Sequence, residues 1–345
     1  MQAKKLALLL LLPCLCAAEG LPLFADNETL DLTFEFPLNT IIRKADDRPV
    51  VEAKVHYTDE TGAAVTVDMT MTTRGKSRLE YCKFPPLSAN FKNQQRKGTL
   101  FEGQKKLKIG TLCRSGSSFE RYLVQEYSIY RAFNVLTDQS FRVRLINATY
   151  RDSEGKKSDM VAKAYFIESE DELTDRLGMQ KKDISIINPD QLEPQHASLF
   201  ALFQYLVANT DWSTLKGPGD DSCCHNGKLV TPPGSNNGWL VIPYDFDQAG
   251  IINTKYSLPA EGLGIKSVRQ RVYRGRCMHL DQLDATVALF NSRRKEIEDA
   301  LVPEALAGKY GDASLRYIDE FYRVINDPLQ REQRIENRCL GGGGD

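Results

Sequence analysis

Residues 239–247 read WLVIPYDFD, a short apolar strand that runs directly into an acidic segment. Trp239–Pro243 has the length and composition of a buried strand, and turn-forming residues precede it. Asp245 and Asp247 follow at its end. The surrounding region, residues 211–252, is rich in Gly, Pro and Asn. The sequence therefore predicts a buried strand that delivers two carboxylates into a polar loop region.

The segments around this region predict a mixed α+β protein. Apolar residues recur three or four apart, as in amphipathic helices, at 196–209, 280–301 and 314–326. Upstream, strand patterns occupy 30–34, 50–57, 64–73, 105–109, 141–150 and 160–167, with one helix inserted at 117–136. We expect a β-rich N-terminal lobe at 19–167, a mainly helical C-terminal lobe at 168–340 with a cleft between them, and a flexible tail at 341–345.

The first 18 residues have the layout of a cleaved secretory signal. A basic start with Lys4 and Lys5 precedes an apolar run, and the segment ends in small residues at Ala17 and Ala18. The run is too short to span a bilayer. A lipoprotein signal is the alternative, although Leu15 stands before Cys16 where a small residue is expected. We predict cleavage near Ala18 and export to the periplasm, the envelope or the medium.

The composition excludes several classes of protein. Of 345 residues, 41% are hydrophobic and 26% are charged, which is typical of a packed globular chain and not of a disordered or multi-span membrane protein. The formal charge is −1, and it becomes −3 without the two lysines of the leader. Nucleic acid is therefore not an expected partner, and no later stretch predicts a transmembrane segment.

Six cysteines remain after the leader, and an even number in an exported chain predicts disulfides. They are Cys82, Cys113, Cys223, Cys224, Cys277 and Cys339. Sequence leaves the pairing open. Because the Cα separation that a disulfide needs is awkward for neighbours, we expect Cys223 and Cys224 to bond to two different places and not to each other.

Three polar segments contain the residue types of a magnesium-nucleotide site. Asn209-Thr210-Asp211-Trp212 and His225-Asn226 precede the strand that ends at Asp245. Carboxylate and amide oxygens are the ligands that Mg²⁺ prefers, and phosphoryl transfer also uses a carboxylate that orients the acceptor. The alternative is that the aspartates cap turns and Asn226 fills a loop.

With these segments in place, residues from about Met69 to Ile252 resemble the CotH family of secreted and spore-coat kinase-like proteins. Six segments carry the resemblance in the family's order: Arg74-Gly75-Lys76-Ser77, Lys105–Ile109, the helix with Arg121 and Glu126, Ala164–Glu168, Asn209–Asp211 with His225-Asn226, and Ile242–Asp247. The resemblance implies a two-lobed atypical protein-kinase-like fold. It also implies transfer of a phosphoryl group from ATP or another nucleotide, with Mg²⁺ or Mn²⁺, to a protein Ser/Thr hydroxyl.

The resemblance also implies which residues act in catalysis. Asp211 would orient or deprotonate the acceptor hydroxyl. Lys106 would bind the nucleotide phosphates and pair with Glu126, with Lys108 as the rival lysine because it shares a strand face with Lys106. Glu120 is the rival acid for the pair with the lysine. The structural alternatives are that the lysines form a basic strand edge and that Glu126 lies on a solvated helix face.

The remaining implied roles concern the nucleotide and the metal. Arg74, Gly75 and Ser77 would form a turn over the phosphates, or else an ordinary hairpin turn. Glu168 would mark the interlobe connection near the adenine, or else lie in a helix N-cap region. The predicted metal ligands are Asn226 and Asp245, with Asp247 as a further ligand or as support.

This sequence departs from the family's pattern. Tyr244 stands where the family often has Trp, and the gap from Asp211 to His225 contains the cysteine pair. ATP is also scarce outside the cytoplasm. A different class of function is therefore kept open: a catalytically inactive kinase-fold binding module at the envelope or surface, whose basic stretch Val268–Cys277 binds an anionic partner such as a phosphorylated peptide or a glycan.

Two other chemistries fit less well. A zinc cluster would use Asp220, Asp221, Cys223, Cys224 and His225, but these ligands are crowded and no second Cys/His pair stands at a suitable spacing. Nucleophilic hydrolysis lacks the Gly-x-Ser-x-Gly segment that presents a reactive serine.

Overall fold

The computed structural model describes residues 21–92, 94–219 and 221–341. The predicted signal at 1–18 lies outside the described residues, as do residues 342–345 of the predicted tail. Both stay predictions.

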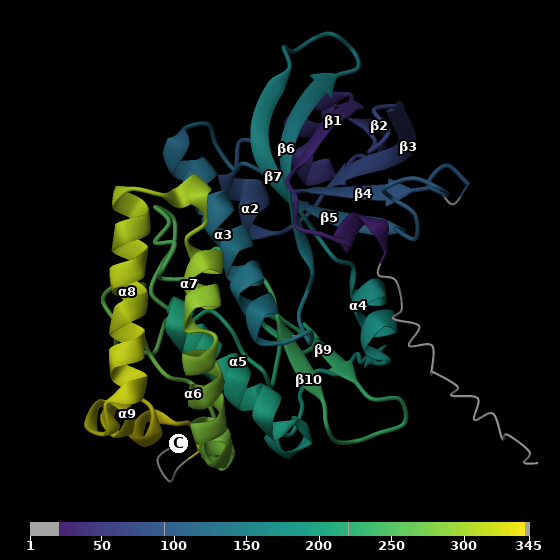
Figure 1. The fold of residues 1–345 in the computed structure, drawn as a ribbon. Helices are drawn as coiled ribbons and strands as arrows, with labels where there is room; N and C mark the ends of the chain where they lie inside the picture. The colour runs from purple at the N-terminus through teal and green to yellow at the C-terminus, as the bar shows by residue number, and fades with distance from the viewer. Residues whose placement is uncertain (1–20, 93, 220, 342–345) are drawn as a thin grey trace, which may run out of the picture.

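The N-terminal strands form a closed seven-stranded barrel (Figure 1). The strands are β1 (Leu30–Phe36), β2 (Val51–Thr58), β3 (Ala64–Thr73), β4 (Leu87–Phe91), β5 (Lys106–Gly110), β6 (Val143–Asp152) and β7 (Met160–Ile167). Their order around the barrel is β1-β2-β3-β4-β5-β7-β6. The pair that closes the barrel, β1 with β6, is parallel, with Leu30 opposite Ile146 and Phe36 opposite Asp152.

Alternation of apolar and polar residues explains the barrel interior. On β3, Val67, Met69 and Met71 are fully buried and alternate with threonines and an aspartate that are partly exposed. Aromatic rings fill the centre: Phe34 stacks on Tyr150 with ring centroids 5.7 Å apart. The interior is a packed core and not a channel.

The expected two-lobed protein-kinase-like fold is wrong. The N-terminal strands close into a barrel in place of that fold's β-sheet lobe, and the molecule as a whole is a mixed α+β structure. Closure brings Asp31 opposite Asn147, and their side chains hydrogen bond at 2.7 Å across a sequence separation of 116 residues. Local sequence patterns predict strands, but they do not specify partners this far apart.

The helices lie mostly after the barrel. They are α1 (Leu38–Arg43), α2 (Ser77–Tyr81), α3 (Ser117–Leu136), α4 (Glu170–Leu177), α5 (Pro194–Val207), α6 (Leu283–Ser292), α7 (Arg294–Leu301), α8 (Lys309–Asn326) and α9 (Pro328–Arg334). A second sheet of three short strands contains β8 (Gln180–Lys181), β9 (Gly227–Thr231) and β10 (Leu240–Pro243), in the order β10-β9-β8. The helix expected across 280–301 is divided at Arg293 into α6 and α7.

Capping residues explain where the helices next to the site begin. α4 starts with a capping box, in which the Ser169 side chain accepts from the Glu172 N–H and the Glu172 side chain accepts from the Ser169 N–H. α5 starts with Pro194 in its first turn, and the Glu193 carboxylate accepts two backbone N–H groups. Among the described residues, no helix combines the length and the apolarity needed to cross a membrane.

Helix α3 connects the barrel to the helical part of the molecule. Tyr130 of α3 packs near Tyr165 of β7, with ring centroids 6.2 Å apart, and Phe133 packs on Phe203 of α5 at 4.8 Å. Figure 1 shows α3 between the barrel and the helices of the C-terminal part. The second sheet is attached to α5 by a hydrogen bond between the His196 Nε2 and the Val241 carbonyl at 3.0 Å. These contacts fix the ends of β9 and β10 relative to the barrel.

The six cysteines form three disulfides, Cys82–Cys113, Cys223–Cys224 and Cys277–Cys339. The expectation that the adjacent cysteines bond to different places is wrong. Their connecting peptide bond is cis, and the Cα atoms lie 3.0 Å apart. The zinc alternative loses both thiolates, because each of these sulfurs is bonded to the other.

Candidate functional site

The strand β10 delivers Asp245 to the edge of the second sheet. Pro243 is opposite Gly227, and the Tyr244 N–H donates to the Asn226 carbonyl at 3.1 Å, so the chain after β10 begins beside Asn226. Asp245 and Asn226 both have left-handed backbones, with φ of 59° and 48°. Asp and Asn tolerate this conformation better than most residues. The Tyr130 hydroxyl of α3 accepts the Asp245 N–H at 2.9 Å and anchors the turn to the core.

Asp211, His225 and Asn226 form one hydrogen-bonded group. Asp211 Oδ1 lies 2.7 Å from His225 Nε2, and Asp211 Oδ2 accepts from Asn226 Nδ2 at 2.9 Å. The hydrogen bond to Asp211 raises the pKa of His225 against an opposing effect of burial. The Asp211 side chain keeps 41% of its surface exposed. A carboxylate that is oriented on both oxygens therefore remains accessible to an incoming molecule.

The loop that carries Asp211 is fixed from two sides. It follows α5 directly, and the Asn209 side chain accepts the Asp211 N–H at 3.1 Å. From the other side, Arg274 Nη1 donates to the carbonyls of Thr210 and Trp212, at 2.6 and 2.8 Å. Arg274 thus holds the backbone on both sides of Asp211.

Arg78 lies close to three carboxylates, those of Glu126, Asp245 and Asp247. Its Nη2 lies 2.6 Å from Glu126 and 3.9 Å from Asp245, and its Nε donates to Asp247 at 3.1 Å. Burial lowers the pKa of Arg78, but Glu126 and Asp247 outweigh it and raise the value well above the ordinary one. Burial raises the pKa of Asp247, and Arg78 opposes this rise. Asp247 is therefore committed to Arg78, whereas the Asp245 side chain is 43% exposed.

Cations surround the Tyr244 side chain. Arg74 Nη1 lies 3.1 Å from the Tyr244 hydroxyl, and the ammonium groups of Lys108 and Lys228 lie 4.4 and 5.6 Å from the ring centroid. Glu170 at the start of α4 pairs with Lys108 at 3.1 Å and with Lys228 at 3.3 Å. Three cations and one acid thus lie beside Tyr244, the residue directly before Asp245.

The structure does not bring all the predicted residues into this site. The Lys106 side chain is exposed at the start of β5, and Glu126 is paired with Arg78 and not with that lysine. Glu168 is buried and accepts from Arg176 at 2.9 and 2.8 Å and from the Arg142 N–H at 3.0 Å. Its carboxylate is used to join β7 to α4. The rival lysine, Lys108, is the one that lies beside Tyr244.

The predicted phosphate turn leads into α2. Gly75 has a φ of 92°, which glycine adopts at no steric cost, and its carbonyl accepts from Arg48 Nη2 at 2.7 Å. Ser77 is exposed at the first position of the helix. The turn places Arg74 against Tyr244 and Arg78 against Glu126.

Asp245 and Asn226 fit a divalent cation better than Asp247 does. With its amide nitrogen turned to Asp211, Asn226 directs the amide oxygen elsewhere, and that oxygen has no hydrogen bond within the described residues. Oxygen donors of this kind suit Mg²⁺. The described part of the chain contains no group of three or more His, Cys, Asp and Glu side chains arranged for a metal. Bound phosphate oxygens or water would have to complete the coordination.

Sequence reasoning missed several residues of the site. Sequence patterns alone do not single out four residues of the site: Arg78, Lys228, Glu170 and Arg274. Arg78 follows Arg74 by four residues, which is one helical turn, and this spacing is the available signal. Glu170 had a weaker signal, because it starts an acidic run after a strand.

Comparison with family models finds no match for this chain, and the search of curated proteins finds none. The resemblance to the CotH family therefore stays a hypothesis that rests on the six segments.

Proposed function

We propose that this protein transfers the terminal phosphoryl group of a magnesium-bound nucleotide to a hydroxyl group of a protein acceptor. The observation that carries the proposal is the placement of cations and oxygen donors on the two sides of Tyr244. Arg74 and Lys108 contact its side chain, while Asn226 and Asp245 adjoin its backbone. A phosphate chain needs the first group, and its divalent cation needs the second.

The basic residues bind and orient the phosphates. Lys108 lies between the carboxylate of Glu170 and the face of Tyr244, which limits its rotamers. Arg74 Nε is also anchored on the Leu87 carbonyl at 3.2 Å. Positive charge held in place in this way stabilises the charge of a transferring phosphoryl group without reorganising during the reaction.

Asp211 orients the acceptor and takes its proton. The acceptor oxygen bonds to the terminal phosphorus, the bond from that phosphorus to the bridging oxygen breaks, and the nucleotide diphosphate leaves. The hydroxyl proton passes to the Asp211 carboxylate. Asn226 and Asp245 hold the Mg²⁺, which supplies neutralising charge for the phosphate oxygens. His225 and Asn226 fix the rotamer of Asp211 through both carboxylate oxygens.

Export is part of the proposal, because three disulfides within the described residues are typical of an oxidising compartment. The donor is then a nucleotide, or another phosphate compound of that class, that reaches this compartment.

The test is titration of the oxidised protein with ATP and Mg²⁺, read by thermal shift and by phosphate incorporation. Asp245→Asn is the informative variant, because Asn tolerates the left-handed backbone of this position. Asp299→Asn, on the exposed face of α7, is the matched control. We expect metal-dependent stabilisation and labelling in wild type and in the control, both lost in Asp245→Asn. No stabilisation and no labelling in wild type would refute the proposal and favour a non-catalytic binding module.

A further inference from the structure

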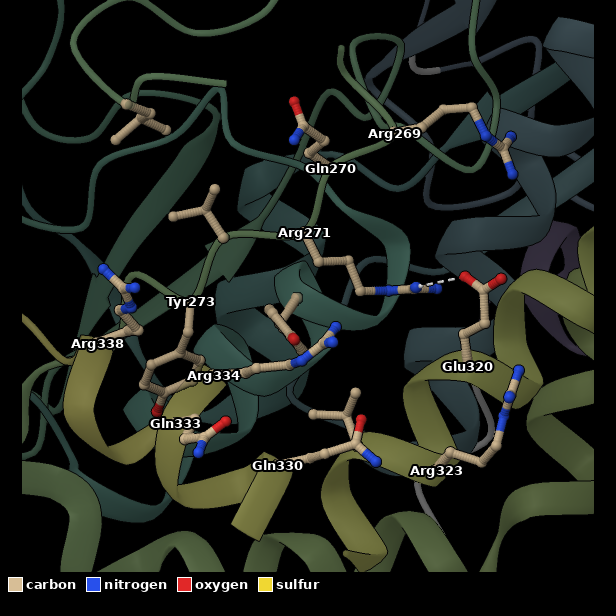
Figure 2. Close-up of a pocket in the computed structure, with 14 residues that line it drawn as sticks. Arg269, Gln270, Arg271, Tyr273, Glu320, Arg323, Gln330, Gln333, Arg334 and Arg338 are labelled. Carbon is tan, nitrogen blue, oxygen red and sulfur yellow. Dashed lines mark hydrogen bonds and ion pairs between the residues drawn. The ribbon is translucent and has the colours of Figure 1, made fainter. Parts of the chain in front are cut away.

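Several arginines gather around a cavity that shares no lining residue with the site described above. The cavity has a volume of about 700 Å³ and lies between the segment after Gln270 and the C-terminal helices α8 and α9. Five arginines line it, with one acid, Glu320. They are Arg269, Arg271, Arg323, Arg334 and Arg338 (Figure 2). None of the catalytic, cationic or metal-binding residues proposed above is among its lining residues.

Arg271 is a fixed part of the cavity wall. Its side chain is only 9% exposed, it donates to the carbonyls of Leu206 and Tyr317, and it lies 3.5 Å from Glu320. Its guanidinium is 3.6 Å from the centroid of the Tyr317 ring, and Arg269 covers the same ring at 4.4 Å. Burial lowers the pKa of Arg271, and Glu320 opposes this effect.

The arginine side chains of the opposite wall are not paired with acids. Within the described residues, the guanidinium groups of Arg323 at the end of α8, Arg334 at the end of α9 and Arg338 make no hydrogen bond, ion pair or ring contact, although Arg334 is close enough to Tyr205 to lower the pKa of its hydroxyl. On the same helix, Arg331 pairs with Asp284 at 3.0 Å and with Glu336 at 2.9 Å. Asp284 and Glu336 are thus paired with the arginine of α9 that does not line the cavity.

This wall is held against the Arg271 segment by covalent and backbone contacts. The Cys277–Cys339 disulfide follows Arg338 directly, and the Cys277 N–H donates to the Leu340 carbonyl at 3.0 Å. Like charges held around one cavity repel each other, and a bound anion removes that cost. Guanidinium groups bind phosphate oxygens through paired N–H donors.

We propose that this cavity binds a compact oligophosphate, through the guanidinium groups of Arg269, Arg323, Arg334 and Arg338. The side chains of these four arginines are exposed, so an incoming anion can reach them, and a ligand that contacts several of them at once needs several negative charges in a small volume. A chain of phosphates provides them, since each phosphate group carries more than one negative charge near neutrality. The volume lies within the range of small-molecule pockets. The proposal does not depend on the phosphotransfer site.

The probe is inorganic tripolyphosphate, titrated into the oxidised protein by calorimetry at constant ionic strength. The protein carries Lys108→Gln, so that one of the cations proposed to bind the nucleotide phosphates at Tyr244 is missing in every sample. We expect tripolyphosphate to bind at least ~10-fold more tightly than orthophosphate, because more guanidinium contacts form at once. ATP without added metal forms a second arm. Binding of both anions would indicate that the cavity takes the phosphate chain of a nucleotide, and binding of tripolyphosphate alone would indicate a free oligophosphate.

Two double variants with the same charge change decide whether the cavity is the binding site. Arg323→Gln with Arg334→Gln removes two cavity arginines, and Arg316→Gln with Arg331→Gln removes two that lie on the same helices but do not line it. We expect the first pair to weaken tripolyphosphate binding at least ~10-fold and the second to change it less than about 3-fold. Equal losses would overturn the proposal, because they would indicate general attraction to net charge. Absence of tripolyphosphate binding in the parent protein would overturn it as well.

Folding of the variants is checked by thermal unfolding without ligand. If the cavity double variant is unfolded, Arg323→Lys with Arg334→Lys replaces it, which retains the charge and removes the planar donor pairs. Weaker tripolyphosphate binding is still expected, and unchanged binding would count against specific recognition.

Discussion

Arg78 of α2 binds Glu126 of α3 at 2.6 Å, and this ion pair joins the turn after β3 to the helix that connects both parts of the molecule. The pair is nearly buried, since the side chains are 16% and 6% exposed. Arg78 also compensates Asp247. A single guanidinium therefore pairs with two buried acids, which makes it a structural centre of the candidate site.

The first prediction concerns this guanidinium. Arg78→Gln should lower the free energy of unfolding by about 3 kcal/mol, because it leaves buried carboxylates uncompensated. Lys76→Gln removes a neighbouring cation from an exposed pair with Asp221 and should cost less than about 1 kcal/mol. Urea unfolding at neutral pH measures both. Equal stabilities of the two variants would contradict a structural role for Arg78.

The second prediction concerns Glu172, whose carboxyl closes the capping box of α4. Burial raises the pKa of Glu172 to about 7 from its ordinary value of 4.5. The folded state then binds more protons than the unfolded state between these values, so the stability that Glu172 contributes is present at low pH and is lost as the pH rises toward 7. Wild type should therefore lose stability across this interval relative to Glu172→Gln.

The measurement is the difference in unfolding free energy between wild type and Glu172→Gln at several pH values from 4.5 to 8. Its slope should approach about 1.4 kcal/mol per pH unit at most. Glu261→Gln, a substitution at an exposed position, serves as the control and should give a flat difference. A flat difference for Glu172→Gln would mean that this carboxyl titrates at its ordinary pKa in the folded protein.

The third prediction concerns the hydrogen bond between Asp211 and His225. Because this bond raises the pKa of His225, the pKa should exceed the ordinary value of 6.5 in wild type and should fall in Asp211→Asn. The stability contributed by the pair is complete below pH 6.5 and is lost as the pH rises through the folded-state pKa. Imidazole resonances followed by NMR report both values. An unchanged pKa in Asp211→Asn would show that this hydrogen bond is absent in solution.

Much of the local structure could be predicted from the sequence, because it depends on nearby residues. The alternation at Ala64–Thr73 matches β3, and the apolar spacing at Ser117–Leu136 matches α3. The closure of the barrel could not be predicted in this way. It depends on the pairing of β1 with β6, which no local pattern specifies.

The residues of the candidate site also divide into those that the sequence can indicate and those that it cannot. Asp211, Asn226 and Asp245 could be chosen from sequence, because polar residues stand out beside an apolar strand and all three meet at the ends of β9 and β10. The ion pairs of the site could not be predicted from the sequence. Lys106 and Lys108 share a strand face in sequence terms, and only the positions of Tyr244 and Glu170 distinguish them.

The fourth prediction concerns a buried hydroxyl in the barrel. Tyr150 is fully buried, and its hydroxyl has no hydrogen-bond partner within the described residues. Tyr150→Phe should therefore be neutral or stabilising by up to about 1 kcal/mol, since it removes an unsatisfied polar group and keeps the ring contacts with Phe34 and Phe84. Thermal unfolding measures the change. A clear loss of stability would reveal a partner for the hydroxyl, such as an ordered water molecule.

The last prediction separates the two lysines of β5. Lys108→Gln should weaken the binding of ATP with Mg²⁺ about 10-fold, because the substitution removes a charged donor beside Tyr244 and the candidate metal site. Lys106→Gln removes the same charge two residues away, from an exposed side chain, and should change binding less than about 2-fold. Titration followed by thermal shift compares both variants with wild type. Because Lys108 also pairs with Glu170, a third variant, Glu170→Gln, tests whether a loss arises from the pair alone. If Lys106→Gln proves the more damaging substitution, phosphate is bound near the start of β5 and the assignment of the site around Tyr244 is wrong.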